Sequence, residues 1–343
     1  MTDVRWGIAG TGTIARLFAA DLRFARGAEL VAVGSRESTR ARSFADSFDV
    51  SRAHGSYRAL FDDVEVDVVY IATPNSQHGG LAIAALKAGK AVLCEKPFTL
   101  NAHEAREVAQ VARRTGRFCM EAMWMRFAPA VRELQARIAQ GEIGTVRHVR
   151  ASLGFAVTFD PTHRIFDLAL GGGALLDLGV YPVSLCCALL GAPRQLTSVA
   201  TLGASGVDEH VTMELSYEHG VTASIETSVR MRLSNDAVVT GTRGQLSLSA
   251  PLYFPQTVSF VPGPEPAADD VTRPQRVLRT MATLARSAFT KPQSPIHGTG
   301  YQYEAQEVMR CLADRRSESE LMSLDASVQV METLDAVRAE WTR

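Results

Sequence analysis

A lysine stands at the end of a strongly apolar run, where a charged side chain adds little to folding. The run Ala91–Cys94 is followed by Glu95, Lys96 and Pro97, and its pattern predicts a buried strand. A partly desolvated ammonium at such a strand end can hold a substrate hydroxyl and lower the pKa of a neighbouring acid. A lysine that simply extends into solvent is the structural alternative. Pro97 restricts Lys96, and their peptide bond could be cis or trans.

Two polar side chains interrupt an apolar, glycine-rich stretch further along the chain. Asp177 and Tyr181 lie four residues apart within residues 170–182. Helical spacing would place both side chains on one face. Two structural alternatives stay open. Asp177 could cap a helix that begins near Leu178 with Pro182 in its first turn, and Tyr181 could be a core tyrosine with a satisfied hydroxyl.

A glycine-rich hexapeptide near the N-terminus has the spacing of a phosphate-binding turn. The residues Gly10-Thr11-Gly12-Thr13-Ile14-Ala15 match G-x-G-x-x-(G/A). Gly10 would permit the tight turn, and Gly12 would let the main chain approach a pyrophosphate. The free N–H groups of the following helix would then face the anion. A plain glycine turn is the alternative, but the position between an expected strand and an expected helix favours dinucleotide binding.

The residues after the second expected strand indicate which dinucleotide binds. An NAD site places an Asp or Glu there to accept a hydrogen bond from the ribose 2′-hydroxyl. This chain has Ser35 and Arg36 instead, with Arg40 one helical turn later. A guanidinium and a hydroxyl suit a 2′-phosphate. We therefore expect NADP(H), although a solvated basic helix start would use the same residue types.

A second loop is expected at the same edge of the sheet. Thr73, Pro74 and Asn75, followed by His78, come directly after the fourth expected strand. Ordinary turn chemistry explains Pro-Asn equally well. The position of the loop at the carboxyl ends of parallel strands predicts that it borders the cofactor.

The elements that must position these residues fall into two groups. Up to about Met120, short apolar strands alternate with amphipathic helices, which predicts an α/β fold with a doubly wound parallel sheet. The expected elements are Val4–Ala9, Ile14–Arg26, Leu30–Gly34, Thr39–Phe48, Val66–Ile71, Gln77–Ala88, Ala91–Cys94, Ala102–Thr115 and Phe118–Met120. Asn101 and Glu104 predict a capped start for the last of these helices.

The pattern changes after about Ala122. A helix (Ala130–Gln140), a strand (Val146–Leu153) and an apolar helix that ends near Leu190 precede several β-rich runs between Leu196 and Phe260. These runs predict an open, mainly antiparallel sheet. A short basic helix is expected within residues 261–300, and closing helices at Tyr303–Leu312 and Leu324–Trp341. We divide the chain into residues 1–122, which bind the dinucleotide, and 123–343.

Composition excludes several classes of protein. The 343 residues carry 36 basic and 37 acidic side chains without a one-sided run, which argues against nucleic-acid and membrane-surface partners. The five cysteines have neither a CxxC pair nor metal-ligand spacing, so we expect reduced, buried thiols and no metal. No export signal is visible, and charged, Gly or Pro residues are expected to keep every apolar stretch below the roughly 20 residues that span a bilayer. A cytosolic protein is therefore expected.

Together these segments resemble the Gfo/Idh/MocA (glucose-fructose oxidoreductase/inositol dehydrogenase) family over essentially the whole chain. The resemblance rests on the glycine turn, Ala72-Thr73-Pro74 with His78, Glu95-Lys96-Pro97 and residues 171–181. Residues 121–127 and 303–312 are most similar to the dimeric dihydrodiol dehydrogenases and NADP-dependent xylose dehydrogenases. The resemblance implies a Rossmann domain, a second α/β domain and a homodimer formed through the outer face of its sheet.

The resemblance also implies roles for individual residues. Lys96 matches the catalytic lysine and Tyr181 the acid/base, with Asp177 nearby, where many members have histidine instead of this tyrosine. Lys96 would lower the pKa of Tyr181. Trp124 and Phe155 match substrate-pocket positions, while Glu95 and Arg164 would approach the cofactor.

The implied activity is an NADP(H)-dependent dehydrogenase or reductase that acts at a secondary carbon of a sugar, cyclic polyol or trans-dihydrodiol. The alternatives are an NAD-dependent glycosidase of the same family, whose members resemble the histidine branch more, and a non-catalytic nucleotide-sensing regulator. The sequence does not name the substrate or the direction of the reaction.

Overall fold

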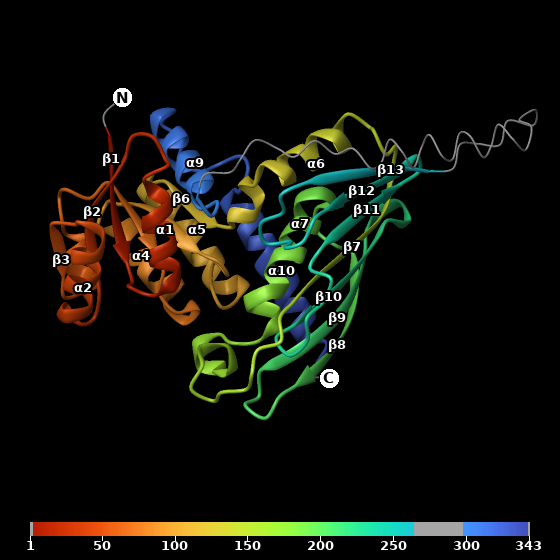
Figure 1. Cartoon of the computed structure of the whole chain (residues 1–343), viewed down its shortest axis with the longest axis horizontal. Helices are drawn as coiled ribbons and strands as arrows, with labels where there is room; N and C mark the ends of the chain where they lie inside the picture. The colour runs from red at the N-terminus through yellow and green to blue at the C-terminus, as the bar shows by residue number, and fades with distance from the viewer. Residues whose placement is uncertain (1–2, 264–297, 342–343) are drawn as a thin grey trace, which may run out of the picture.

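The computed structural model describes residues 3–263 and 298–341. These residues form two sheets with helices packed between and around them (Figure 1). The basic helix expected within residues 261–300 falls largely outside the described residues.

The N-terminal sheet is parallel throughout and has six strands in the order β3-β2-β1-β4-β5-β6. This order confirms the predicted doubly wound sheet. Its elements are β1 (Val4–Ala9), α1 (Thr13–Leu22), β2 (Ala28–Gly34), α2 (Ser38–Phe48), β3 (Arg52–His54), α3 (Tyr57–Phe61), β4 (Val68–Ile71), α4 (His78–Lys87), β5 (Ala91–Glu95), α5 (Ala102–Thr115) and β6 (Cys119–Ala122). The sequence did not predict β3 and α3, because three strand residues and five helix residues are too short for a periodic pattern. The cap on α5 is confirmed, since the Asn101 side chain accepts a hydrogen bond from the Glu104 amide at 2.9 Å.

The second sheet has seven strands in the order β13-β12-β11-β7-β10-β9-β8. It is mainly antiparallel, as predicted, but β7 and β10 pair in parallel. Its strands are β7 (Val146–Gly154), β8 (Gln195–Leu202), β9 (Asp208–Ser216), β10 (Thr222–Ser228), β11 (Ala237–Gly241), β12 (Gly244–Leu248) and β13 (Val258–Pro262). Alternating hydrophobic residues predict a strand but not the strand with which it pairs. The parallel pairing of β7 with β10 could therefore not be predicted from the sequence.

In the described part of the chain, helices pack on only one face of the second sheet (Figure 1). These are α6 (Pro129–Ala139), α7 (Val180–Leu190) and α10 (Leu324–Ala339). The closing helices also return to the first sheet, because α10 packs on α5 and α9 (Gln302–Ala313) packs on α1. The C-terminal segment therefore contributes to both halves of the molecule, and the division at residue 122 stays a prediction.

The apolar segment around α7 corrects one expectation. Residues Leu168–Leu190 form a helical stretch of 23 residues with mean hydropathy 1.8, long and apolar enough to cross a membrane by length and composition. Asp177, Pro182 and four glycines do lie in this stretch, but the expectation that such residues keep every apolar stretch too short to span a membrane is wrong here. Of its most apolar window, 83% is buried inside the fold, which is the position of a core helix.

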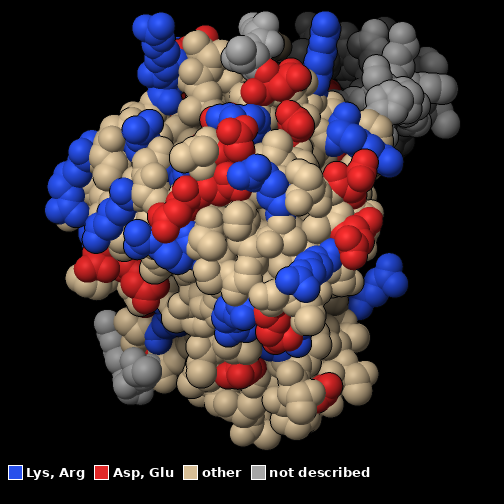
Figure 2. All heavy atoms as spheres, turned by 90° about the vertical axis from the view of Figure 1, so that its left-hand side faces the viewer, with Lys and Arg blue, Asp and Glu red and all other residues tan. Residues whose placement is uncertain are grey.

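The cysteines and the surface charges follow the expectations drawn from the composition. All five cysteines are free and buried, as predicted. On the face formed by the N-terminal half, basic and acidic side chains are interspersed (Figure 2). This mixed face agrees with the balanced composition.

Close approach of the chain segments that follow β1 and β4 depends on Gly10. Its φ is +119°, and a Cβ there would meet the Ala72 carbonyl oxygen at 2.3 Å, whereas a Cβ on Gly12 would meet nothing within 4 Å. We expect Gly10→Ala to lower the free energy of unfolding by at least about 1–3 kcal/mol, the cost of a strained backbone, while Gly12→Ala leaves it nearly unchanged. Thermal denaturation of both variants measures the difference. Equal melting temperatures for the two would contradict this explanation.

Candidate active site

Lys96 reaches from the end of β5 to the glycine-rich segment of the second half. Its Nζ donates a hydrogen bond to the Asp177 carbonyl oxygen at 2.8 Å and lies 3.6 Å from Asp177 Oδ1. The ammonium also lies over the Tyr181 ring, 4.9 Å from its centroid. Only 14% of the Lys96 side chain is exposed, so the solvated strand-end alternative is wrong. The Lys96–Pro97 peptide bond is cis.

Asp177 is a buried carboxylate between two cations. Besides the Lys96 ammonium, Arg164 Nη1 donates a hydrogen bond to Asp177 Oδ1 at 3.0 Å. Burial raises the pKa of Asp177, but Lys96 and Arg164 together outweigh burial and hold it below its usual value. Asp177 is therefore ionised at neutral pH. The sequence placed Arg164 near a cofactor; the structure brings its guanidinium to Asp177.

Tyr181 is 5% exposed, and its hydroxyl oxygen accepts a hydrogen bond from Trp124 Nε1 at 2.9 Å. Burial and the carboxylates of Glu95 and Asp177 raise the pKa of Tyr181 well above 10, although the Trp124 hydrogen bond opposes them. The expectation of a lowered pKa is wrong, because burial is the largest cause and raises it. Tyr181 is thus a neutral phenol that can donate a proton.

The local backbone explains how Asp177 and Tyr181 come together. Residues Leu175–Gly179 form a π-helical turn, and α7 begins at Val180 with Pro182 in its first turn. Proline is tolerated there, and π turns occur frequently at functional sites. The prediction of Pro182 in a first turn is confirmed. The alternative in which Asp177 caps the helix is wrong, since Gly179 occupies the cap position.

The N-terminal half holds the Lys96 backbone through a buried carboxyl group. Glu95 Oε2 accepts the Lys96 amide hydrogen at 3.0 Å, and Glu95 Oε1 accepts a hydrogen bond from the Tyr70 hydroxyl. Tyr70 is held in turn by Phe18 of α1, whose ring stacks on it with centroids 3.7 Å apart. Glu95 is 6% exposed. The geometry therefore makes Glu95 a support for Lys96, whereas the sequence placed it at the cofactor.

The loop after β4 is tied to its surroundings by two buried side chains. His78 is fully buried, and its ring nitrogens lie 2.8 Å from the Pro97 oxygen and 3.0 Å from the Thr73 oxygen. Burial lowers the pKa of His78. Asn75 Nδ2 donates a hydrogen bond to the Gly171 oxygen at 3.0 Å and so joins the two halves. Both residues hold the loops together, and His78 exposes no surface for direct contact with a cofactor.

The remaining residues of the predicted dinucleotide site fit such a ligand. The first turn of α1 has no side-chain cap, and the space above Gly12 is open. Thr73 Oγ1 is buried without a hydrogen-bond partner among the described residues, as expected of a group that bonds to a ligand.

At the adenosine end, Ser35 is buried, whereas Arg36 and Arg40 are exposed. Arg36 lies near Tyr57, whose pKa it lowers against the larger effect of burial. Arg40 Nε forms an ion pair with Glu37 at 2.9 Å. Its charge is therefore partly compensated by the one acid of this segment.

Aromatic rings line the C-terminal side of Tyr181. The Tyr253 ring centroid lies 5.7 Å from Trp124, 6.0 Å from Phe155 and 6.3 Å from Tyr181. Trp124 and Phe155 were predicted here from the family resemblance, whereas Tyr253 was not. It lies in the segment between β12 and β13, where no motif or periodicity distinguishes it from any other loop tyrosine.

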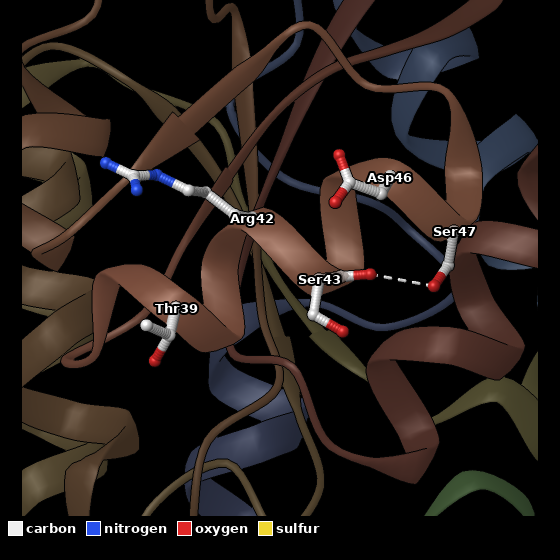
Figure 3. A pocket seen from close by; sticks show the side chains of 5 residues that line it. All are labelled: Thr39, Arg42, Ser43, Asp46 and Ser47. Carbon is white, nitrogen blue, oxygen red and sulfur yellow. Dashed lines mark hydrogen bonds between the residues drawn. The ribbon is translucent and has the colours of Figure 1, made fainter.

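A hollow along the outer side of α2 does not belong to this site. It is lined by Thr39, Arg42, Ser43, Asp46 and Ser47, which are all exposed (Figure 3). The hydrogen bond drawn there, from Ser47 Oγ to the Ser43 oxygen at 2.7 Å, stays within the helix. None of these residues contacts Lys96, Asp177 or Tyr181. Among the described residues, no group of three or more potential ligands could hold a metal ion.

A parallel six-stranded sheet with a glycine turn after β1, and a lysine and a tyrosine brought together beside a second sheet, define a dinucleotide-binding oxidoreductase. The family model "Oxidoreductase family, NAD-binding Rossmann fold" matches residues 4–123, and the model "GFO/IDH/MocA C-terminal domain" matches residues 131–247. The chain belongs to the Gfo/Idh/MocA family of oxidoreductases.

Several relatives match over nearly the full length. The trans-1,2-dihydrobenzene-1,2-diol dehydrogenase of Bos taurus is 38% identical over 98% of this chain and 96% of its own. The enzyme of the same name from Homo sapiens is 37% identical over the same shares.

Two solved structures have the same fold. A 3-ketoreductase from Actinomadura kijaniata, in complex with NADP and TDP-benzene, has a TM-score of 0.82 at 25% identity over 99% of this chain and 98% of its own. A levoglucosan dehydrogenase, in complex with NADH and levoglucosan, has a TM-score of 0.84 at 22% identity over the same shares.

Proposed function

We propose that this chain is an NADP(H)-dependent oxidoreductase of the cytosol, which acts at a secondary carbon of a sugar, cyclic polyol or trans-dihydrodiol. The observation that carries the proposal is the neutral phenol of Tyr181, held by Trp124 next to the Lys96–Asp177 pair. When bound, the nicotinamide supplies or accepts the hydride.

The different protonation states of Tyr181 and Asp177 support different roles for the two acids. A carbonyl oxygen that is being reduced must receive a proton as negative charge builds on it. Tyr181 keeps its proton because its pKa is raised, whereas Asp177 has lost its proton because its pKa is lowered. Tyr181 is therefore the general acid in reduction, which leaves it as a phenolate. In the reverse reaction Tyr181 must start as this phenolate, which accepts the proton of the substrate hydroxyl as the hydride leaves. Asp177 keeps Lys96 in position.

Lys96 supplies positive charge next to the substrate oxygen. Its ammonium has three donors, of which one bonds to the Asp177 carbonyl oxygen. The others are available to a substrate hydroxyl or carbonyl, which would stabilise the developing alkoxide. The aromatic wall of Trp124, Phe155 and Tyr253 would pack against the apolar face of a sugar ring or a dihydrodiol.

The dinucleotide would be held by residues of both loops at the edge of the first sheet. Gly10, Gly12 and the first amides of α1, at Thr13 and Ile14, would hold the pyrophosphate, with Thr11, Thr73 and Pro74 next to it. Ser35 and Arg36 would bind the 2′-phosphate, with Arg40 as a weaker contributor.

The alternatives have less support. A glycosidase of this family is more similar to the branch with histidine at the position of Tyr181. A nucleotide-sensing regulator needs no proton donor, yet this chain has both Lys96 and Tyr181 in contact. Turnover of a panel of sugars and diols, followed at the nicotinamide absorbance, tests the proposed function, and hydrolysis without net nicotinamide change would favour the glycosidase.

Removal of the Tyr181 hydroxyl tests the acid. We expect Tyr181→Phe to lower kcat on the order of 100-fold or more, because the positioned proton donor is lost, and to leave cofactor affinity nearly unchanged. Tyr217→Phe is the matched control, since Tyr217 is also buried and its hydroxyl has no hydrogen-bond partner in the part of the chain that the structure describes. Steady-state kinetics and cofactor titration give both quantities. A Tyr181→Phe enzyme that keeps most of its turnover would show that another group donates the proton.

Charge reversal at Arg36 tests the cofactor preference. Arg36→Asp removes a partner of the 2′-phosphate and supplies an acceptor for the ribose 2′-hydroxyl, so the preference should shift from NADP(H) toward NAD(H) by about tenfold or more. Arg42→Asp, on the outer side of α2, changes the net charge equally and should leave the preference unchanged. Fluorescence titration with both cofactors measures it. Wild-type protein that binds NAD(H) as tightly as NADP(H) would refute the preference.

We also propose a homodimer that forms through the outer face of the second sheet. The Ser198 hydroxyl bonds to α10, so the neighbouring Val199 points to the outer face, where it is 72% exposed. Light scattering at micromolar concentration should give a dimer, and Val199→Asp should raise the monomer fraction. Val64→Asp is the control, because Val64 is 79% exposed on the first domain. A wild-type monomer under these conditions would exclude the dimer.

A further inference from the structure

A buried carboxylate at the end of α1 has no role in the site described so far. Asp21 is 3% exposed and lies in the last turn of α1. The negative end of a helix dipole disfavours a carboxylate there, so α1 itself gives no reason for it. Its partners come from the other end of the chain.

The carboxylate of Asp21 collects four donors from three consecutive residues. Oδ2 accepts hydrogen bonds from the Thr299 amide, the Thr299 hydroxyl and the Gly300 amide at 2.8 Å each, and from the Tyr301 amide at 3.0 Å. Oδ1 accepts from the Thr299 amide at 3.0 Å. Successive amides that point to one anion form a concave backbone site, and here the protein supplies the anion.

The two glycines of this segment fit the arrangement closely. Gly298 and Gly300 have φ values of +75° and +118°. A Cβ on Gly298 would meet Asp21 Oδ1 at 2.5 Å, and a Cβ on Gly300 would meet the Phe254 ring at 2.3 Å. The backbone of residues 298–301 is therefore shaped around the Asp21 carboxylate and the Phe254 ring.

The segment ends in a ring that supports the catalytic tyrosine. Tyr301 is 5% exposed, and its ring stacks on Trp124 with centroids 4.4 Å apart and planes 5° apart. Trp124 donates its indole N–H to the Tyr181 oxygen at 2.9 Å. Because an indole N–H only donates, Tyr181 must accept in this bond, and its own proton points elsewhere. Phe254 also stacks on Trp124, with centroids 5.0 Å apart, so Tyr301 and Phe254 together hold the indole that keeps the Tyr181 proton from pointing toward Trp124.

We propose that Asp21 is a positioning residue for the reaction, which holds residues 299–301 and thereby keeps the Tyr301–Trp124 stack in the orientation that aims the Tyr181 hydroxyl at the substrate. The inference rests on the proposed role of Tyr181. It also gives α1 two functions, because the helix begins at the glycine turn and ends at this carboxylate. The binding of the dinucleotide and the orientation of the Tyr181 hydroxyl then both depend on α1.

The first test removes the charge of Asp21 and keeps its shape. Asp21→Asn should lower kcat by about 10- to 100-fold, as expected for a small misplacement of a catalytic group, and leave the Kd of NADP(H) within about twofold. Glu307→Gln is the matched control. Glu307 is a 7% exposed carboxylate of α9 that bonds to Ser319 and Arg310, away from the aromatic stack. It should lower thermal stability and leave kcat unchanged.

A spectroscopic measurement tests the same inference without a substrate. The chain has three tryptophans, so the indole N–H resonance of Trp124 can be assigned in a ¹⁵N spectrum from its loss in Trp124→Phe. Asp21→Asn should move this resonance, whereas Glu307→Gln should not. If Asp21→Asn does not fold, Tyr301→Leu replaces it, with Tyr301→Phe as the conservative variant that should restore both kcat and the resonance.

The outcomes separate the two proposals. Loss of turnover in Tyr181→Phe but not in Asp21→Asn or Tyr301→Leu would overturn the positioning role alone. A Trp124 resonance that stays in place in Asp21→Asn, or an equal fall of kcat in Glu307→Gln, would overturn it as well. Retained turnover in Tyr181→Phe would instead refute the assignment of the acid, and with it the premise of this inference.

Discussion

The arrangement of the site depends on one interaction, the insertion of the Lys96 ammonium between the two halves of the molecule. Its hydrogen bond to the Asp177 carbonyl oxygen and its ion pair with the Asp177 side chain join the end of β5 to the π turn before α7. A largely buried ammonium is unfavourable unless it is paired and hydrogen-bonded. This requirement sets the distance between the two halves and brings Tyr181 next to the edge where parallel sheets bind ligands.

The two acids of the buried site have different protonation states. Asp177 lies between two cations and is ionised, while Tyr181 lies among carboxyl groups and aromatic rings and keeps its proton. Two neighbouring groups whose pKa values are moved in opposite directions are characteristic of acid and base assignments in enzymes. Here burial raises both pKa values, and only Asp177 faces cations that outweigh it.

In each half of the molecule, a series of buried contacts supports one residue of the site, Lys96 in the first half and Tyr181 in the second. In the first half, Phe18 packs on Tyr70, which bonds to Glu95, which holds the Lys96 backbone. In the second half, Tyr301 packs on Trp124, which bonds to Tyr181. Both series begin at α1, through Phe18 in the first and Asp21 in the second. The helix that follows the glycine turn therefore supports both residues proposed to act on the substrate oxygen.

The sequence by itself determined the class of fold, the family and the position of the main elements, because these depend on local periodicity and on short motifs with fixed spacing. The parallel sheet, the mainly antiparallel second sheet and the cap of α5 followed from such signals, as did Lys96, Asp177 and Tyr181 as candidates. Only the tertiary structure decided the protonation of Tyr181, the pairing of Arg164 with Asp177, the burial of His78 and Glu95, and the contacts of Asp21 and Tyr253. Asp21 bonds to residues nearly 280 positions away in the chain. Burial and long-range pairing are set by the packing of distant segments, and no local pattern contains them.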